Sequence, residues 1–413
     1  MITKRDLLKT AAAGGALLGT SGAGVAAHAA QGKKITLPGP ITADERRARI
    51  ARGQTLMQQR GLGGILLEPG SSMRYFAGLS WWRSERLTAV VIPAEGDIVV
   101  VTPAFEEPSI REQMELPAEV RVWNEDESPF ALVAGALDDR GAKGALGLER
   151  TVRYFVVDGL KRDMPGRETA SAEPVVNGCR MIKSETELAL MQAANDITMA
   201  AYREIYPKVE AGMTGSDISA MMNEATEKLG GTPQFSLALV GEASAYPHGS
   251  KKVHEVAEGE VVLMDCGCAL HGYQSDISRT WVHGEANDEQ TRVWNLVKEG
   301  QELALETAKI GVPARRVDQA VRQLYEREGF GPGYQLPGLS HRLGHGIGMD
   351  GHEPINFVGN EDTPLAAGMC LSNEPGLYLP GKFGVRHEDC LYMTEEGPKL
   401  FSGLSPSIDD PMA

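Results

Sequence analysis

Short apolar runs alternate with amphipathic stretches along the first part of the chain. Thr42-Ala-Asp-Glu45 has the spacing of a capping box and predicts a helix to about residue 60. A second helix is predicted at 129–139. The apolar runs that predict strands lie at 64–68, 73–76, 87–92, 97–102, 120–123 and 145–148. This pattern is typical of an α/β domain with a mixed sheet, expected over residues 35–175.

A helix-rich region follows a polar, Pro- and Gly-containing stretch, so a domain boundary is expected between 175 and 183. Another capping-box spacing at Ser184 predicts a helix to about residue 206, and a second helix runs to Gly230. A similar helix pair lies within 287–329. The repeat indicates an internal duplication over residues 180–405, with two helix pairs around a sheet.

The stretch 261–281 predicts a β-hairpin, because two apolar runs flank a His271-Gly272 turn signal. A two-residue turn at Leu270 and His271 would place Asp265 and Asp276 directly opposite each other. Carboxylates in such a pair have Cβ atoms about 4.5–5.5 Å apart and destabilise a sheet unless a cation lies between them. The hairpin therefore predicts a metal site.

A second hairpin over 369–392 repeats the arrangement. A turn centred on Gly381 would place Glu374 opposite Glu388 on one face. Between the two hairpins lies a glycine-rich stretch that contains His345, where the backbone can approach a site closely. Four carboxylates and one imidazole suit two divalent metal ions such as Mn, Co or Zn, with Mn expected first.

Composition narrows the class of protein. With 413 residues the chain has room for two domains. The net charge of -15 makes nucleic acid and anionic membranes poor partners. Five cysteines without C-x-x-C spacing form neither a zinc finger nor a disulfide framework, so no essential disulfide is expected. Pairing of Cys370 with Cys390 and burial of both as free thiols stay open.

Residues 1–29 are expected to be a cleaved export signal rather than part of the fold. A short basic head precedes an apolar run over 10–25, and Ala27-His-Ala29 fits a cleavage site. The run is too short and glycine-rich for a stable membrane span. Thr3 to Lys9 resembles a twin-arginine signal with lysine in place of the first arginine, so twin-arginine and general secretory export stay open. A periplasmic protein is expected.

These motifs, in this order, resemble the pita-bread metallopeptidases, specifically the aminopeptidase P and prolidase branch. The N-terminal domain resembles that of creatinase and aminopeptidase P. The residues that carry the resemblance are Asp265, Asp276, Gly344-His345-Gly-Ile-Gly with His352-Glu353, Asn373-Glu374-Pro-Gly, and Val385-Arg-His-Glu388-Asp. The resemblance implies a curved antiparallel sheet with two pseudo-symmetric helix pairs and a dinuclear metal centre.

The resemblance also implies a role for each metal ligand. Asp265 would bind one ion, and His345 and Glu374 the other. Asp276 and Glu388 would bridge both. Glu374 would also accept the proton of the attacking water.

Further site residues follow from the resemblance. His248, in Tyr246-Pro-His248-Gly, would steady the scissile carbonyl, and His352 would line the leaving-group side. Arg386 lies beside the bridging glutamate, and Arg386 and His341 are candidates for the substrate pocket. His387 stands where the family has an aliphatic residue. It should point away from Arg386 and Glu388, so a structural role is expected.

Trp82 lies in the loop Trp81-Trp82-Arg83-Ser-Glu85 and allows two interpretations. It could belong to an aromatic core. Alternatively, the loop reaches the active site, either that of its own chain or that of a neighbouring subunit, and closes over the substrate. Family members with two such domains commonly dimerise, so a homodimer or a higher homo-oligomer is expected.

The function expected from the resemblance is hydrolysis of the bond before proline at the N-terminus of peptides, as an Xaa-Pro aminopeptidase or dipeptidase. The alternative is a hydrolase of a small non-peptide C–N bond, like ectoine hydrolase or creatinase. Creatinase-type members lack the metals, whereas all five ligand positions are filled here. A pita-bread binding module is a third interpretation, and such modules typically lack the ligands.

Overall fold

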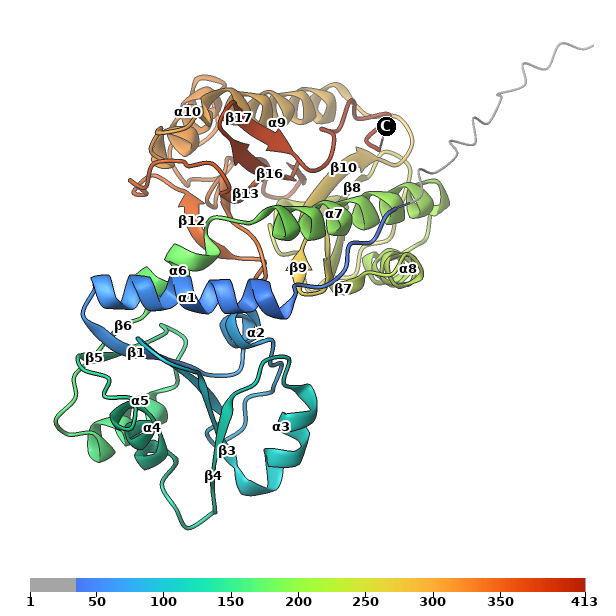
Figure 1. The fold of residues 1–413 in the computed structure, drawn as a ribbon. Helices are drawn as coiled ribbons and strands as arrows, with labels where there is room; N and C mark the ends of the chain where they lie inside the picture. Colours follow the sequence, from blue (N-terminus) through green and yellow to red (C-terminus); the bar gives the residue numbers. More distant parts are fainter. Residues whose placement is uncertain (1–34, 413) are drawn as a thin grey trace, which may run out of the picture. The chain divides into compact units, whose positions relative to one another are not determined.

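The computed structural model describes residues 35–412. Its first part is a six-stranded mixed sheet in the order β4-β3-β2-β1-β5-β6 (Figure 1). β2 pairs antiparallel with β1 and β3, and the other pairs in the sheet are parallel. The strands are β1 Leu62–Leu67, β2 Ala89–Pro93, β3 Val99–Pro103, β4 Glu119–Trp123, β5 Ala145–Leu148 and β6 Thr169–Ser171.

Alternation of side chains along these strands gives the sheet two apolar faces. One packs on α4 and α5 through residues such as Val91, Val133 and Leu160. The other packs on α1, α2 and α6 through residues such as Ile65, Phe76 and Val176. The helices are α1 Ala43–Gln59, α2 Ser71–Ala77, η1 Ala104–Glu106, α3 Glu107–Gln113, α4 Pro129–Asp138, α5 Tyr154–Asp163 and α6 Glu173–Arg180.

Residues 73–76 form part of α2, so the strand predicted there is wrong. The helix ends at Gly78, which adopts the left-handed conformation and donates its N–H to Arg74 O. An apolar run of four residues fits a buried helix as well as a strand, and the closing glycine decides between them. The sequence prediction also missed α5 and α6, and α6 spans the stretch where the domain boundary was expected.

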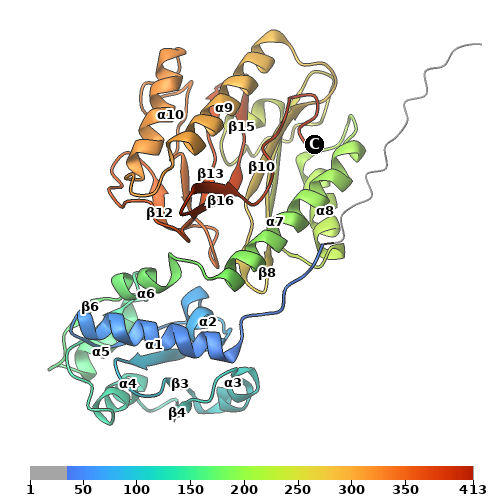
Figure 2. The same ribbon diagram turned by 45° about the horizontal axis from the view of Figure 1, so that its top comes forward.

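The second part contains two helix pairs, which Figures 1 and 2 show as α7 beside α8 and α9 beside α10. The helices are α7 Glu185–Ile205, η2 Tyr206–Lys208, α8 Gly215–Lys228, η3 Gly241–Ala245, α9 Asp288–Thr307 and α10 Arg315–Arg327. The strands are β7 Thr232–Val240, β8 Val261–Leu270, β9 Tyr273–Gln274, β10 Ile277–Val282, β11 Gly344–Gly346, β12 Glu353–Phe357, β13 Cys370–Asn373, β14 Gly376–Leu379, β15 Phe383–Arg386, β16 Asp389–Thr394 and β17 Gly397–Leu400.

The sheets of the two halves meet at one antiparallel bridge. One half has the order β10-β8-β7 and the other β12-β11-β13-β16-β17. Ser278 N donates to Glu388 O and Glu388 N donates to Ser278 O, both at 3.2 Å. The predicted duplication is visible in the isolated bridges Thr214–Glu255 and Pro313–Pro364, which precede the second helix of each pair.

The register of the first hairpin differs from the prediction. The turn residues are His271 and Gly272, both with positive φ (49° and 92°), as a type I′ turn requires. Leu270 therefore pairs with Tyr273, and Asp265 pairs with Ser278 instead of Asp276. The two aspartates keep the same face because the register has moved by two positions.

The second hairpin has the predicted register. Leu379 pairs with Phe383 and Gly376 with Arg386, around a three-residue turn that contains Gly381. On the far side of Glu374 and Glu388, Asn373 pairs with Asp389 in the same register. The glutamates are therefore opposite each other, as predicted.

The predictions about the cysteines, a membrane span and the export signal have three different outcomes. All five cysteines are buried as free thiols, Cys370 and Cys390 included. Across residues 35–412, no helix is both long and apolar enough to cross a membrane. The predicted export signal lies outside the described residues.

Candidate metal centre

Three buried side chains converge where the two half-sheets meet. Asp276, His345 and Glu388 each offer a ligand atom, and these atoms lie within 4.8 Å of one another. His345 Nε2 lies 3.6 Å from Asp276 Oδ2 and 4.0 Å from Glu388 Oε1. Glu374 joins them, with its Oε1 3.3 Å from the same nitrogen. Four of the five predicted ligands therefore surround one point.

Three of these four side chains lie just outside a regular strand. Asp276 lies between β9 and β10, and Glu388 between β15 and β16, beside the Ser278 bridge that joins the sheets. Glu374 follows β13 directly, and His345 is the middle residue of β11. Segments far apart in sequence thus bring one ligand each to a common site.

The hydrogen bonding of His345 prepares it as a ligand. Its Nδ1 lies 3.0 Å from Gly346 O, so this nitrogen carries the proton and donates it to the carbonyl. The Nε2 lone pair then faces the carboxylates, the arrangement usual for histidine bound to metal. Burial, aided by nearby His352, lowers the pKa of His345 to about 3 and keeps the ring neutral.

The carboxylates fit a cation because three of their oxygens have no protein partner. Asp265 Oδ1, Asp276 Oδ1 and Glu388 Oε1 are buried without a hydrogen bond. Burying an unpaired carboxylate is costly. Burial and the neighbouring carboxylates raise the pKa of Asp276 and of Glu388 well above the ordinary range. Divalent ions would satisfy these oxygens and offset the repulsion, so the residues fit the predicted pair of metals.

Asp265 is held by Arg386. The guanidinium Nη2 lies 2.6 Å from Asp265 Oδ2. Arg386 is buried and also donates from Nε to Ser278 Oγ and from Nη1 to Pro247 O and Tyr378 Oη. These bonds engage four of its five N–H donors within the protein. Arg386 thus positions Asp265, and its contact with substrate stays a prediction.

Ser278 and Tyr378 belong to the site and were missed by the sequence prediction. Ser278 Oγ donates to Glu388 Oε2 at 2.9 Å. Tyr378 Oη lies 2.8 Å from His341 Nε2 and accepts the bond from Arg386. Both could have been found from strand alternation, since Tyr378 shares a face with Glu374 and Ser278 with Asp276.

His341 lies beside the carboxylates, as expected for a pocket residue. Its Nδ1 is 3.8 Å from Glu374 Oε2 and 2.7 Å from Arg342 O. Burial and the charge of Arg386 lower the pKa of His341 to about 3, so the ring is neutral. The interaction with Glu374 is therefore that of a neutral imidazole and not an ion pair.

His352 and His248 lie at the edge of this cluster. The His352 ring packs against His345, with 4.2 Å between centroids. His248 is exposed in the turn after η3, and burial and the charge of Arg342 lower the pKa of His352. Their assigned roles stay predictions.

Two other residues lie away from the metal ligands. His387 lies between β15 and β16 and is buried, and its ring packs on that of Trp294 with 4.4 Å between centroids, in keeping with the expected structural role. Trp82 is 58% exposed and stacks on Trp81, with 4.2 Å between ring centroids. The interpretation of Trp82 as aromatic core is therefore wrong. Its predicted place over a partner's site is not tested by a single chain.

Two family models match the chain: "Metallopeptidase family M24" over residues 189–395 and "Creatinase/Prolidase N-terminal domain" over residues 49–182. An uncharacterized peptidase of Schizosaccharomyces pombe is 32% identical over 376 residues, covering 86% of this chain and 81% of that protein. The Xaa-Pro dipeptidase of Pyrococcus horikoshii is 28% identical over 354 residues, covering 83% and 93%.

A solved structure shows the same fold. The dipeptidase PepE from Mycobacterium ulcerans superposes with a TM-score of 0.82 at 29% identity, covering 88% of this chain and 97% of that one. The predicted fold class is therefore confirmed, with a pita-bread domain preceded by a creatinase-like α/β domain.

Proposed function

The chain belongs to metallopeptidase family M24, and we propose that it uses two divalent metal ions to hydrolyse the Xaa-Pro bond at the N-terminus of peptides. The observation that carries this proposal is the set of buried carboxylate oxygens without partners around neutral His345. The name of the Pyrococcus horikoshii relative, Xaa-Pro dipeptidase, supports the same substrate class.

We assign the ligands as the family resemblance implies, with Asp265 on one ion, His345 and Glu374 on the other, and Asp276 and Glu388 shared. When bound, the ions supply Lewis acidity that polarises a carbonyl and lowers the pKa of water. The ligand set is rich in oxygen, which favours Mn.

Glu374 is the ligand best placed to move a proton. Its side chain is 13% exposed, whereas those of Asp276 and Glu388 are 8% and 2% exposed. Asp265 is also reachable, but Arg386 occupies one of its oxygens. Glu374 can therefore accept a proton from attacking water and deliver it to the leaving nitrogen.

Three histidines steady the substrate in this proposal. A prolyl amide has no N–H, so the site must act on the carbonyl side of the bond. His248, exposed in its turn, can reach a carbonyl oxygen, and His352 forms a wall beside His345. His341 sits deeper, fixed by Tyr378, and lines the pocket.

The assembly and location of the protein are further parts of the proposal. The exposed Trp82 ring, stacked on Trp81, supports a homodimer in which this loop covers the partner's site. Sedimentation of the purified protein measures the assembly, and a monomer would contradict it. Export to the periplasm rests on the sequence of residues 1–29 alone.

A metal-reconstituted assay tests the function. The mature protein, loaded with Mn, should hydrolyse Xaa-Pro dipeptides or longer Xaa-Pro peptides and leave creatine and ectoine unchanged. Glu374→Gln keeps the shape of the side chain but removes the base, so kcat should fall by about 10²–10⁴.

Glu395→Gln is the matched control, because Glu395 is exposed between β16 and β17. It should retain full activity. Full activity of Glu374→Gln would contradict the mechanism, and hydrolysis of creatine or ectoine in place of peptides would contradict the substrate class.

A further inference from the structure

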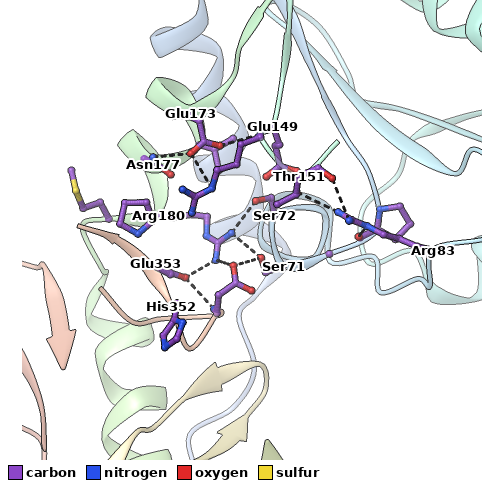
Figure 3. Close-up of a pocket in the computed structure, with 17 residues that line it drawn as sticks. Ser71, Ser72, Arg83, Glu149, Thr151, Glu173, Asn177, Arg180, His352 and Glu353 are labelled. Carbon is purple, nitrogen blue, oxygen red and sulfur yellow. Dashed lines mark hydrogen bonds and ion pairs between the residues drawn. The ribbon is translucent and has the colours of Figure 1, made fainter. Parts of the chain in front are cut away.

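We propose that a cavity beside His352 binds the part of a peptide substrate that follows proline, so that the protein acts on oligopeptides longer than dipeptides. The proposal rests on the function proposed above. The cavity measures about 360 Å³, and Figure 3 shows the residues that line it. Those used in the argument are Ser71, Arg83, Thr151, Asn177, Arg180 and His352. We call this space the outer cavity.

The outer cavity adjoins the candidate metal centre. His352 lines the cavity, and its ring packs on the ring of His345. His345 in turn lies 3.3 Å from Glu374. One imidazole ring therefore forms a shared wall, and a peptide that passes His352 leaves the metal ligands and enters the cavity.

The direction of the peptide follows from the chemistry. An enzyme that releases a single N-terminal residue needs room for only one residue on that side of the scissile bond. Everything else in the substrate lies on the side of the leaving proline. A ligand-sized space next to the site can therefore accommodate only the continuation of the leaving peptide.

Arg180, in the inner wall of the cavity, is held by several hydrogen bonds. Arg180 Nη1 donates to Ser71 Oγ and Ser72 Oγ at 2.8 and 2.9 Å. Its Nη2 donates to Asp350 and Glu353. The guanidinium is buried, and four of its five N–H groups donate to these oxygens, so its charge is paired within the wall.

Arg83 differs from Arg180 because its charge is not matched. All its hydrogen bonds go to neutral oxygens: Pro69 O at 2.9 Å, and Thr151 O and Oγ1 at 3.3 Å. No carboxylate pairs with it among residues 35–412, and the side chain is exposed. In Figure 3, Arg83 and His352 lie at opposite ends of the labelled set.

An exposed guanidinium at the end of a peptide-sized cavity suits a carboxylate. In a short peptide bound through its N-terminal end, the C-terminus supplies that group. The favoured ligands are therefore peptides of three to five residues, with proline second and a free C-terminus.

A comparison of the wild type with three variants on paired substrates tests the proposal. The substrates are Ala-Pro and the series from Ala-Pro-Ala to the pentapeptide, each longer peptide also as its C-terminal amide. In the wild type, kcat/KM for the best longer peptide should exceed that for its amide about tenfold, the effect of one charge-assisted hydrogen bond. In Arg83→Gln the acid and the amide should become equal.

Thr151→Trp adds bulk to the cavity from an exposed position and should lower the ratio of longer-peptide to dipeptide turnover. Arg86→Gln is the matched control. Arg86 lies on the same loop but pairs with Glu125 and does not line the cavity, so its acid-to-amide ratio should match the wild type.

Equal turnover of acid and amide by the wild type would overturn the carboxylate contact. An unchanged length preference in Thr151→Trp would overturn the cavity as a subsite. If neither dipeptide nor longer peptide is cleaved, the proposed function fails. Calorimetric binding of Ala-Pro-Ala-Ala then tests the subsite separately. Arg83→Gln should bind this peptide more weakly than the wild type, and equal affinities of the two proteins would overturn the subsite.

Discussion

At the scale of single residues, the candidate site depends on groups that never touch a metal. Arg386 ties Asp265 to Ser278 and Tyr378, and Ser278 in turn donates to Glu388. Ligands on different strands are thus joined by side-chain hydrogen bonds. Such supporting contacts orient metal ligands and commonly matter nearly as much as the ligands.

Tyr378 tests this support. Tyr378→Phe removes one hydroxyl that links Arg386 to His341 and leaves the ring in place. Losing these bonds should lower kcat/KM on an Xaa-Pro peptide by about tenfold and weaken metal binding, because two partners lose a bond worth about 1 kcal/mol each. Kinetics and metal titration measure the effect.

Tyr392→Phe is the control for this change. Tyr392 lies on β16 and packs its ring against Phe401, away from the ligands. It should behave like the wild type in both measurements. A Tyr378→Phe enzyme that matches it would show that the hydroxyl does not support the site.

At the scale of elements, the two hairpins show how a turn sets the position of a ligand. In the first hairpin the turn residues His271 and Gly272 both need positive φ, and this conformation fixes which residues pair beyond it. Gly272 also lies against another part of the chain, since a Cβ there would meet Arg74 Nη1 at 2.6 Å. Gly381 in the second hairpin has open space around it.

Replacing each of these glycines by alanine distinguishes the cost of a left-handed backbone from the cost of a steric clash. Gly381→Ala should cost about 1–2 kcal/mol in the free energy of unfolding, for the left-handed backbone alone. Gly272→Ala should cost more, because Arg74 must also move, and it should weaken metal binding through Asp276. Urea unfolding and metal titration of both variants provide the comparison, and equal losses would contradict the role of Arg74.

At the scale of the whole molecule, a buried ion network joins α6 and the segment after it to the loop that carries His352. Glu353 accepts hydrogen bonds from Met349 N, Arg180 and Lys183 Nζ. Burial alone would raise the pKa of Glu353, but the charges of Lys183 and Arg180 lower it to about 2. Arg180 and Lys183 lie 173 and 170 residues from Glu353 in the sequence.

The lowered pKa of Glu353 determines in which direction its contribution to stability changes with pH. A carboxyl with a depressed folded pKa contributes in full above its unfolded pKa, here 4.5, and loses the contribution as the pH falls toward about 2. Glu353→Gln should therefore cost about 3–5 kcal/mol at pH 7, since it leaves buried charges unpaired, and less at pH 3. Urea unfolding at both pH values measures this.

A surface pair provides the control. Glu289 binds Lys382 at 2.7 Å with both side chains about half exposed. Glu289→Gln should change the free energy of unfolding by less than about 1 kcal/mol at pH 7. A penalty for Glu353→Gln that stays constant from pH 7 to pH 3 would contradict the network's role.

The sequence by itself determined the ligand types, their order and the faces they share. Strand periodicity puts Asp265 on the same face as Asp276, and Glu374 on the same face as Glu388, and the observed register shift of two in the first hairpin leaves every side chain on its face. Capping boxes at Thr42 and Ser184 located two long helices, since these signals are local.

Only the tertiary structure decided the rest. The pairing of Asp265 with Ser278 depends on the backbone conformation of His271, and α2 depends on the closing Gly78. The hydrogen bonds of Arg386 join Asp265, Ser278 and Tyr378 from separate segments, and the outer cavity arises where α2, α6 and residues 350–354 come together. Sequence patterns show the local periodicity of helices and strands. These contacts instead join segments that are distant in the sequence and meet only when the chain packs.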